Sequence, residues 1–338
     1  MRQRIRIGSR LFLLVLLLPV ITGSAQDIQI RTRVDLVVVP VTVKTKADKL
    51  VTGLTKDDFT VLEDGRKQTI TNFTIDPVPL SAAVLIDTGV SESSLSKVQK
   101  TFPALAGAFS EFGEVSVYRF DKFVKKVLDF SRESAVVETS MKTLGNIKGD
   151  PIPYPPAPGG PFSIPGPVIN GAAVVPPGQI GPASTARPKR IKVLNDAIFA
   201  AASDLAQRER DRRKIVLVIS DGYNEGSDHS YDDTVKSLLE TGIEVYAVGL
   251  DENVLTRALS LLNKYAKATG GDAYFVSSIQ NIEQSYATAA EAARNQYVLG
   301  YISTNRVDGP APVFRDIQVV VARAGFETLH RRGYYQFP

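Results

Sequence analysis

The middle of the chain alternates between uninterrupted apolar runs and segments with the period of amphipathic helices. Ala82 to Ile86 and Ile215 to Ile219 contain only Ala, Val, Leu and Ile, which is typical of parallel strands covered on both faces. The same pattern predicts four further strands, at 114–120, 124–130, 244–249 and 273–276. We therefore predict an α/β fold with a doubly wound, mostly parallel sheet of the Rossmann-like kind.

Both ends of this block carry a β pattern. Before it, strands are predicted at 34–43, 59–63 and 68–74; after it, at 297–302, 317–322 and 327–335. Neither end alone has enough strands to bury a core, so we expect both to form one small β-sandwich into which the α/β block is inserted. The expected divisions are an N-terminal β segment (26–77), an α/β domain (78–294) and a C-terminal β segment (295–338).

A proline-rich segment interrupts the α/β pattern. Residues 151–188 hold twelve of the chain's twenty prolines, with glycines between them, and such a segment forms no packed helix or strand. We expect an extended surface insertion over 149–188. It is either a solvated linker or a strap that contacts a partner.

The N-terminus has the pattern of a secretory signal peptide over residues 1–25. Four arginines precede an apolar core at 11–21, and Gly23-Ser24-Ala25 offers a small-residue cleavage site. Because that core is short for a bilayer span, we expect an exported mature protein with no stable membrane span, located in the periplasm, the cell envelope or the medium. An uncleaved anchor is the alternative.

Charge and composition narrow the possible functions. Without the four N-terminal arginines the chain has 36 basic and 36 acidic residues, so nothing favours a nucleic-acid partner. Cysteine is absent, which excludes disulfides, thiol nucleophiles and thiolate metal sites. The two histidines, His229 and His330, are far apart in the sequence, which leaves little basis for a histidine metal site or a Ser-His-Asp triad.

Two aspartates follow the most apolar strands directly. Asp87 comes after the strand at 82–86, and Asp221 follows Ser220 after the strand at 215–219. Ligands of open α/β sheets collect outside the carboxyl ends of parallel strands. We therefore expect Asp87 and Asp221 to lie together in one site.

This arrangement resembles the metal-ion-dependent adhesion site of von Willebrand factor type A domains, with Asp87-x-Gly89-x-Ser91 on the first strand and Ser220-Asp221-Gly222 on the fourth. The resemblance extends to the acidobacterial family of exported proteins with a von Willebrand factor A-related domain. The segments that carry this wider resemblance are 33–39 (RVDLVVV), 54–59, 63–65, 195–198 (NDAI), 296–301 (QYVLGY) and 331–335 (RRGYY).

The resemblance implies a site for a hard divalent cation such as Mg²⁺, held by oxygen atoms alone. Asp87, Ser91 and Asp221 stand at positions of metal ligands, and no other cofactor is implied. Two positions depart from the family pattern, because Gly89 replaces a serine and Lys192 aligns with a threonine. A glycine supplies no side-chain oxygen, and a lysine ammonium beside two carboxylates competes with a cation.

Two interpretations of the site therefore stay open: a metal site, or a degenerate site in which Lys192 pairs with the carboxylates. Individual residues also have simpler explanations, since Ser91 can cap the helix that follows it and Asp221-Gly222 can form a turn. Leu85-Ile86-Asp87-Thr88-Gly89 also resembles the aspartic protease signature, a chemistry that needs two carboxyl groups sharing a proton.

The function implied by the resemblance is binding of another protein, in adhesion or assembly, without enzymatic activity. The alternatives are a structural envelope protein without a metal site and an aspartic protease. The sequence points to no particular partner and to no oligomeric state.

Overall fold

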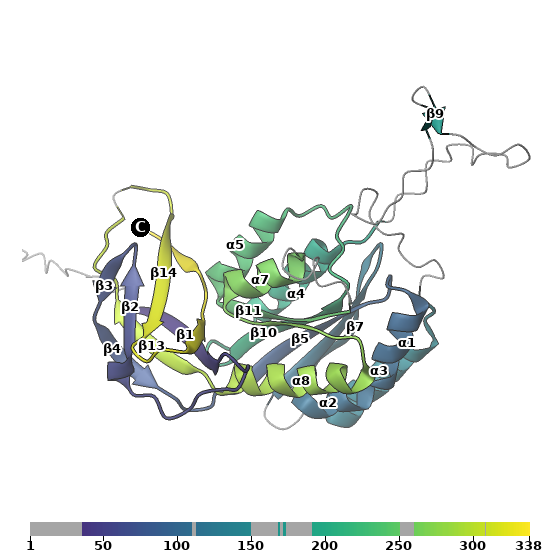
Figure 1. The fold of residues 1–338 in the computed structure, drawn as a ribbon, viewed down its shortest axis with the longest axis horizontal. Helices are drawn as coiled ribbons and strands as arrows, with labels where there is room; N and C mark the ends of the chain where they lie inside the picture. Colours follow the sequence, from purple (N-terminus) through teal and green to yellow (C-terminus); the bar gives the residue numbers. More distant parts are fainter. Residues whose placement is uncertain are drawn as a thin grey trace, which may run out of the picture. The chain divides into compact units, whose positions relative to one another are not determined.

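The computed structural model describes residues 36–109, 113–149, 168–169, 172–173, 191–250, 260–307 and 309–338 (Figure 1). The predicted signal peptide and most of the predicted proline-rich insertion lie outside the described residues. Within the insertion, β8 (Val168–Ile169) and β9 (Ala172–Ala173) form a short antiparallel pair. The chain from Asp35 to Pro338 forms a single compact unit. In the described ranges, no helix combines the length and apolar character needed to cross a membrane.

A six-stranded sheet forms the centre of the α/β block, as predicted. Its strand order is β12-β11-β10-β5-β6-β7, and only the β6–β7 pair is antiparallel. Every residue of β5 and β10 is buried, which explains their continuous apolar runs. The strands are β5 (Leu80–Asp87), β6 (Gly113–Phe120), β7 (Val124–Ser131), β10 (Arg213–Ser220), β11 (Ile243–Gly249) and β12 (Ala273–Phe275).

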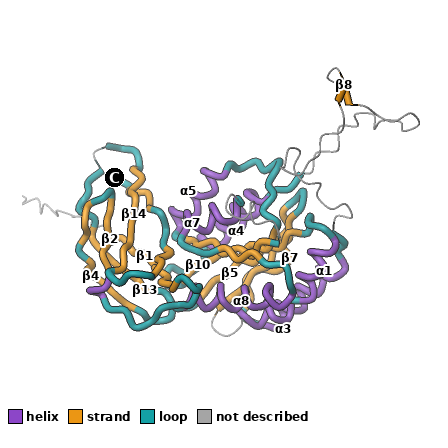
Figure 2. Tube along the Cα trace, viewed as in Figure 1, coloured by secondary structure: helices purple, strands orange, loops and turns teal. Residues whose placement is uncertain are grey.

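Helices cover both faces of this sheet (Figures 1 and 2). One face packs against α1 (Glu92–Lys100), α2 (Phe102–Phe109), α3 (Ser134–Thr143) and α8 (Ile279–Arg294). The other packs against α4 (Leu194–Ala206), α5 (Tyr231–Thr241) and α7 (Leu261–Thr269). Successive β5 side chains alternate between the two cores, with Val84 in the first and Leu85 in the second.

The two chain ends form one β-sandwich, as predicted. The first sheet has the order β15-β1-β13-β4 and the second the order β16-β14-β2-β3, so each sheet combines strands from both ends. The first contains β1 (Leu36–Thr45), β4 (Ile70–Thr74), β13 (Tyr297–Ile302) and β15 (Phe326–Leu329). The second contains β2 (Phe59–Glu63), β3 (Arg66–Gln68), β14 (Val313–Val321) and β16 (Gly333–Gln336). The described residues also contain two single-turn 3-10 helices, η1 (Lys56–Asp58) before β2 and η2 (Leu144–Asn146) after α3.

Two predicted strands are each divided between the sheets of the sandwich. The strand expected at 68–74 ends at Gln68, which pairs with β2, and restarts at Ile70, which pairs with β13. The strand expected at 327–335 divides into β15 and β16, which belong to different sheets. At the first break a single residue, Thr69, separates β3 from β4, so the sequence gives no sign of it. The second break falls on the polar run His330-Arg331-Arg332 before Gly333, a signal that the sequence analysis did not use.

A buried polar group links the sandwich to the central sheet. The side-chain Nε2 of Gln296, which precedes β13, donates to Glu244 Oε2 at 2.8 Å and to Thr42 Oγ1 at 3.2 Å. Glu244 lies on β11 and Thr42 on β1. Burial raises the pKa of Glu244 above its usual range. The amide hydrogen bonds offset part of the cost of burying these groups.

We predict that His330 makes the protein less stable in mild acid. Its Nε2 accepts from the Val319 backbone N–H at 3.2 Å, its Nδ1 lies 2.9 Å from the Arg331 carbonyl, and burial lowers its pKa. The unfolded state therefore binds more protons below about pH 6.5, and the free energy of unfolding falls as pH decreases through that value. Urea unfolding near pH 7.5 and near pH 5 should show less loss in His330→Gln than in the wild type. Equal losses in the two proteins would contradict this role.

Candidate functional site

The structure brings the two predicted aspartates together at the carboxyl edge of the central sheet. Asp87 is the last residue of β5, and Asp221 directly follows β10. These strands are parallel neighbours, with Ile219 opposite Ile86, so both aspartates emerge side by side. Asp87 is fully covered at 1% exposure, whereas the Asp221 side chain keeps 20%. One buried and one half-buried carboxylate thus occupy the same edge.

The side chain of Lys192 lies between these carboxylates. Its Nζ is 2.9 Å from Asp87 Oδ2 and 2.9 Å from both carboxylate oxygens of Asp221. The Lys192 side chain is only 3% exposed. Its backbone is held by two hydrogen bonds of 2.8 Å with Glu225, one in each direction. The ammonium group is therefore fixed at the centre of the site by both its backbone and its side chain.

Two neutral donors, one at the end of β10 and one in the loop after β5, complete the environment of Asp87. Its Oδ2 also accepts from the Ser220 hydroxyl at 2.6 Å, and its Oδ1 accepts from the Gly89 N–H at 2.9 Å. Burial raises the pKa of Asp87 to about 6; Lys192 opposes the rise and Asp221 adds to it. The sequence did not predict the role of Ser220, whose hydroxyl also accepts from the Gly222 N–H at 3.0 Å.

The missing side chain of Gly89 makes room for Lys192. A Cβ atom at position 89 would lie 3.3 Å from Lys192 Cε and 3.4 Å from Asp87 Oδ1. Gly89 does not have a positive φ, so space rather than backbone conformation favours glycine here. The two departures from the family pattern are thus physically connected, because the lysine fills space next to the absent side chain.

Ser91 is positioned as the N-cap of α1. Its Oγ accepts from the Ser94 backbone N–H at 3.2 Å and lies 3.0 Å from the Ser94 hydroxyl. This is the simpler of the two explanations that the sequence offers for Ser91. The hydroxyl is directed to the helix end, where it satisfies a backbone donor.

The residues present do not fit a divalent cation of the Mg²⁺ type. The Lys192 ammonium lies where a cation would contact both carboxylates, Gly89 offers no oxygen, and Ser91 caps a helix. In the part of the chain that the structure describes, no group of three or more His, Cys, Asp or Glu side chains is placed to hold a metal. The carboxylates also contact an ammonium group, which differs from the shared proton of an aspartic protease.

A second polar cluster holds the loop that follows Asp221. Asp196, at the start of α4, accepts from the His229 backbone N–H at 2.9 Å, and its Oδ1 lies 2.8 Å from His229 Nδ1. The adjacent Asn195 donates from Nδ2 to the His229 carbonyl at 3.0 Å and accepts from the Tyr265 hydroxyl at 2.8 Å. The Asn195-Asp196 pair therefore has a positioning role, because it ties the loop to α4 and α7.

Two exposed apolar side chains lie beside the site, and the sequence analysis did not identify them. Phe123, in the turn between β6 and β7, is 76% exposed, and Ile191 is 46% exposed next to Lys192. The turn is held by Asp121, which exchanges hydrogen bonds of 3.1 and 3.2 Å with Phe123. The Asp121 carboxylate also lies 3.3 Å from the Thr88 hydroxyl. The sequence did contain one sign of Phe123, because a phenylalanine is unusual in a turn as polar as Asp121-Lys122-Phe123.

Comparison with known proteins supports the assignment of the α/β block. The sequence model of the von Willebrand factor type A domain matches residues 185–290, which include Lys192 and Asp221. No curated protein matches the chain.

Three solved structures are similar at low identity. An aerotolerance-related membrane protein from Bacteroides fragilis NCTC 9343 is 13% identical, with 63% of this chain and 98% of that chain covered and a TM-score of 0.41. Proximal thread matrix protein 1 from the mussel byssus, with a zinc-occupied MIDAS motif, is 13% identical over 68% of this chain and 49% of that chain, with a TM-score of 0.44. A von Willebrand factor type A protein from Catenulispora acidiphila is 10% identical, with 81% of this chain and 73% of that chain covered and a TM-score of 0.43.

We predict that a methyl group at position 89 is destabilising only while Lys192 is present. Gly89→Ala should lower the free energy of unfolding by about 1–2 kcal/mol, because Lys192 is held by its hydrogen bonds and cannot move aside. In a Lys192→Thr background the same change should cost little. A double-mutant cycle by urea unfolding measures this coupling. Gly107→Ala, on an open helix surface, is the control and should be neutral or stabilising.

We also predict that loss of the Lys192 charge is costly and depends on pH. Lys192→Met should lower the free energy of unfolding by about 3–5 kcal/mol near pH 7.5, because it leaves two neighbouring carboxylates without their cation. The raised pKa of Asp87 means that its protonated form is favoured by folding, so stability is lost as pH rises through about 4 to 6. Without Lys192 this loss should increase.

The cost of Lys192→Met should therefore be smaller near pH 5 than near pH 7.5, as measured by urea unfolding. Lys236→Met is the matched control, because Lys236 is exposed and its nearest carboxylate oxygen, on Glu240, is 4.0 Å away. That change should cost less than about 1 kcal/mol at either pH. A pH-independent cost at Lys192 would show that the carboxylates do not depend on its charge.

Proposed function

We propose that this chain, which contains a von Willebrand factor type A domain, is an exported protein-binding module that works without a metal ion. Domains of this type generally mediate interactions between proteins, and they are typically not enzymes. The more specific proposal is that the adhesion site is degenerate, with a lysine in place of the metal ion, and it rests on one observation. The Lys192 ammonium makes three contacts of 2.9 Å with the carboxylates of Asp87 and Asp221.

The lysine acts in this proposal as a permanent internal cation. An ion held by oxygen ligands can leave one position for a carboxylate of the partner. The Lys192 side chain is only 3% exposed, so a carboxylate from outside has little access to it. Recognition must then rest on the surface around the site. The internal ion pair serves to hold the surrounding loops in one arrangement.

The apolar rim formed by Phe123 and Ile191 provides the contact surface in this proposal. Exposed aromatic side chains that a partner can cover completely contribute most of the energy at many protein interfaces. Phe123 has this character at 76% exposure, and the hydrogen bonds of Asp121 fix its turn next to the site. The partner should therefore offer an apolar pocket in place of the acidic side chain that a metal site would select.

The proposal of export rests on the N-terminal pattern of arginines, apolar core and small residues. The motifs at 33–39, 296–301 and 331–335 further support a place in the acidobacterial family of exported proteins with a von Willebrand factor A-related domain. An exported protein that binds through Phe123 would meet its partner in the periplasm, the cell envelope or the medium.

Cross-linked capture from the source cell envelope tests this function. Capture should be the same with Mg²⁺ and with a chelator, and Phe123→Asp should reduce it about tenfold or more. Phe337→Asp is the matched control, because Phe337 is also exposed, at 44%, but follows β16 in the sandwich. Loss of capture in chelator would overturn metal independence. Equal effects of the two substitutions, or loss only when residues 151–182 are deleted, would overturn the assigned surface.

A further inference from the structure

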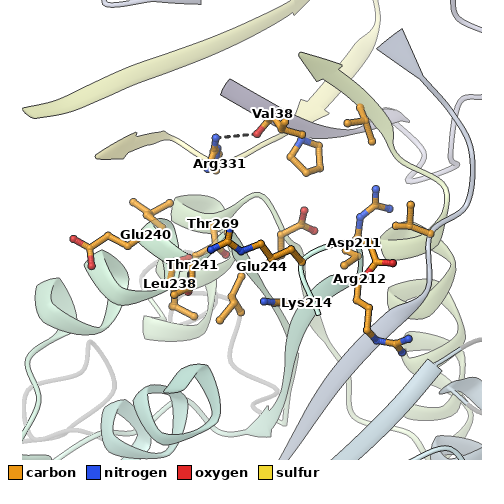
Figure 3. A pocket seen from close by; sticks show the side chains of 18 of the residues that line it. Val38, Asp211, Arg212, Lys214, Leu238, Glu240, Thr241, Glu244, Thr269 and Arg331 are labelled. Carbon is orange, nitrogen blue, oxygen red and sulfur yellow. Dashed lines mark hydrogen bonds between the residues drawn. The ribbon is translucent and has the colours of Figure 1, made fainter. Parts of the chain in front are cut away.

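A cavity lies where the strands of the central sheet begin, at the edge opposite the Lys192 site (Figure 3). It has a volume of about 450 Å³ and is lined where β10 begins at Arg213 and β11 begins at Ile243. Asp221 follows the other end of β10, and Asp87 is the last residue of the parallel neighbour β5, so the cavity is separate from the site described above. Its volume falls within the range of roughly 300–1,000 Å³ that is usual for small-molecule sites.

One wall of the cavity is apolar and belongs to the sandwich. Leu36, Val38 and Pro40 alternate along β1 with core residues and all line the cavity. Leu36 is 53% exposed and Val38 is 40% exposed, although both are large apolar side chains. Val298 on β13 lies opposite Pro40 and extends the same wall. Because a strand rises about 3.4 Å per residue, this apolar stripe is roughly 14 Å long.

The rest of the lining has an excess of positive charge. Five cationic side chains line the cavity against three acidic ones, and one of the acids, Glu244, is engaged by Gln296. Among the described residues, Lys214 Nζ donates one hydrogen bond, of 3.4 Å, to the Ala206 carbonyl. Arg331 donates from Nη2 to the Val38 carbonyl at 2.8 Å, while its buried Nε has no hydrogen-bond partner in the described structure.

We propose that this cavity binds a free long-chain carboxylate. The acidic head group would lie between Arg331 and Lys214, which come from different sides of the cavity, and the alkyl chain would follow the apolar stripe of β1 (Figure 3). A carboxylate would give Lys214 a closer acceptor than the Ala206 carbonyl at 3.4 Å and would balance the positive charge of Arg331, while the chain covers Leu36 and Val38. The inference is independent of the proposed function, since it involves no residue of the Lys192 site.

Calorimetric titration of the full-length mature protein with laurate tests this proposal. Laurate should bind at least tenfold more tightly than dodecanol, which lacks the charge, and than acetate, which lacks the chain. Lys214→Gln and Val38→Asp should each weaken laurate binding about tenfold. Val320→Asp is the matched control, because Val320 is 42% exposed on β14 and does not line the cavity; it should leave binding unchanged.

Val38→Thr keeps the shape and β-branching of valine, so it serves if the aspartate variant folds poorly, and it should weaken binding several-fold. Equal affinities for laurate and dodecanol would overturn the role of the cations. Laurate binding that neither Lys214→Gln nor the Val38 variants reduce would place the ligand elsewhere and overturn the site. Absence of laurate binding would overturn the proposal entirely.

Discussion

The arrangement of the loops at the carboxyl edge of the central sheet depends on one buried ion cluster, in which a single ammonium group contacts two carboxylates. Removing three charged groups from water is costly, and one cation cannot neutralise two anions. Neutral donors therefore complete the cluster: the Ser220 hydroxyl and the Gly89 N–H for Asp87, and the Tyr223 N–H for Asp221 at 3.0 Å. The Ser220 hydroxyl comes from the last residue of β10, and the other two donors come from the loops that follow β5 and β10. The cluster consequently fixes those loops relative to one another, and with them the rim on which the proposed binding surface lies.

Much of the fold was predictable because its central strands are buried on both sides. The apolar runs of β5 and β10 predicted the sheet, and the aspartates that follow these runs predicted that two carboxylates meet at its carboxyl edge. The division of the strand at 68–74 was not predictable, since only Thr69 separates β3 from β4, whereas the polar run His330-Arg331-Arg332 was an unused sign of the second division. Ser91 shows a further limit of prediction from sequence, because an Asp-x-x-x-Ser spacing is compatible with both a metal ligand and a helix cap. A phenylalanine in a polar turn was a sign of Phe123, but the exposure that makes it a candidate contact depends on tertiary structure.

The two edges of the central sheet differ in electrostatic character for a general reason. Helices in this fold run opposite to the strands, so their C-terminal carbonyl groups collect at the edge where strands begin. Arg213, at the start of β10, donates to the carbonyls of Ala293 and Arg294 at the end of α8, and Lys214 approaches Ala206 at the end of α4. Basic residues are therefore expected near the cavity lined by β1 and β10 even without a ligand. Its distinguishing feature is their combination with an exposed apolar wall.

The pairing of β1 with β13 sets a condition on the order of folding. Leu36 lies opposite Ile302, so nearly the whole chain must be available before this pair can form. Sheets of such high contact order form slowly, and an unpaired strand as apolar as β1 is prone to associate with other chains in the meantime. A chain that crosses a membrane unfolded, with its N-terminus first, would expose β1 from the beginning of transport to the end. In that case, chaperones that hold extended apolar segments are expected to matter for its yield.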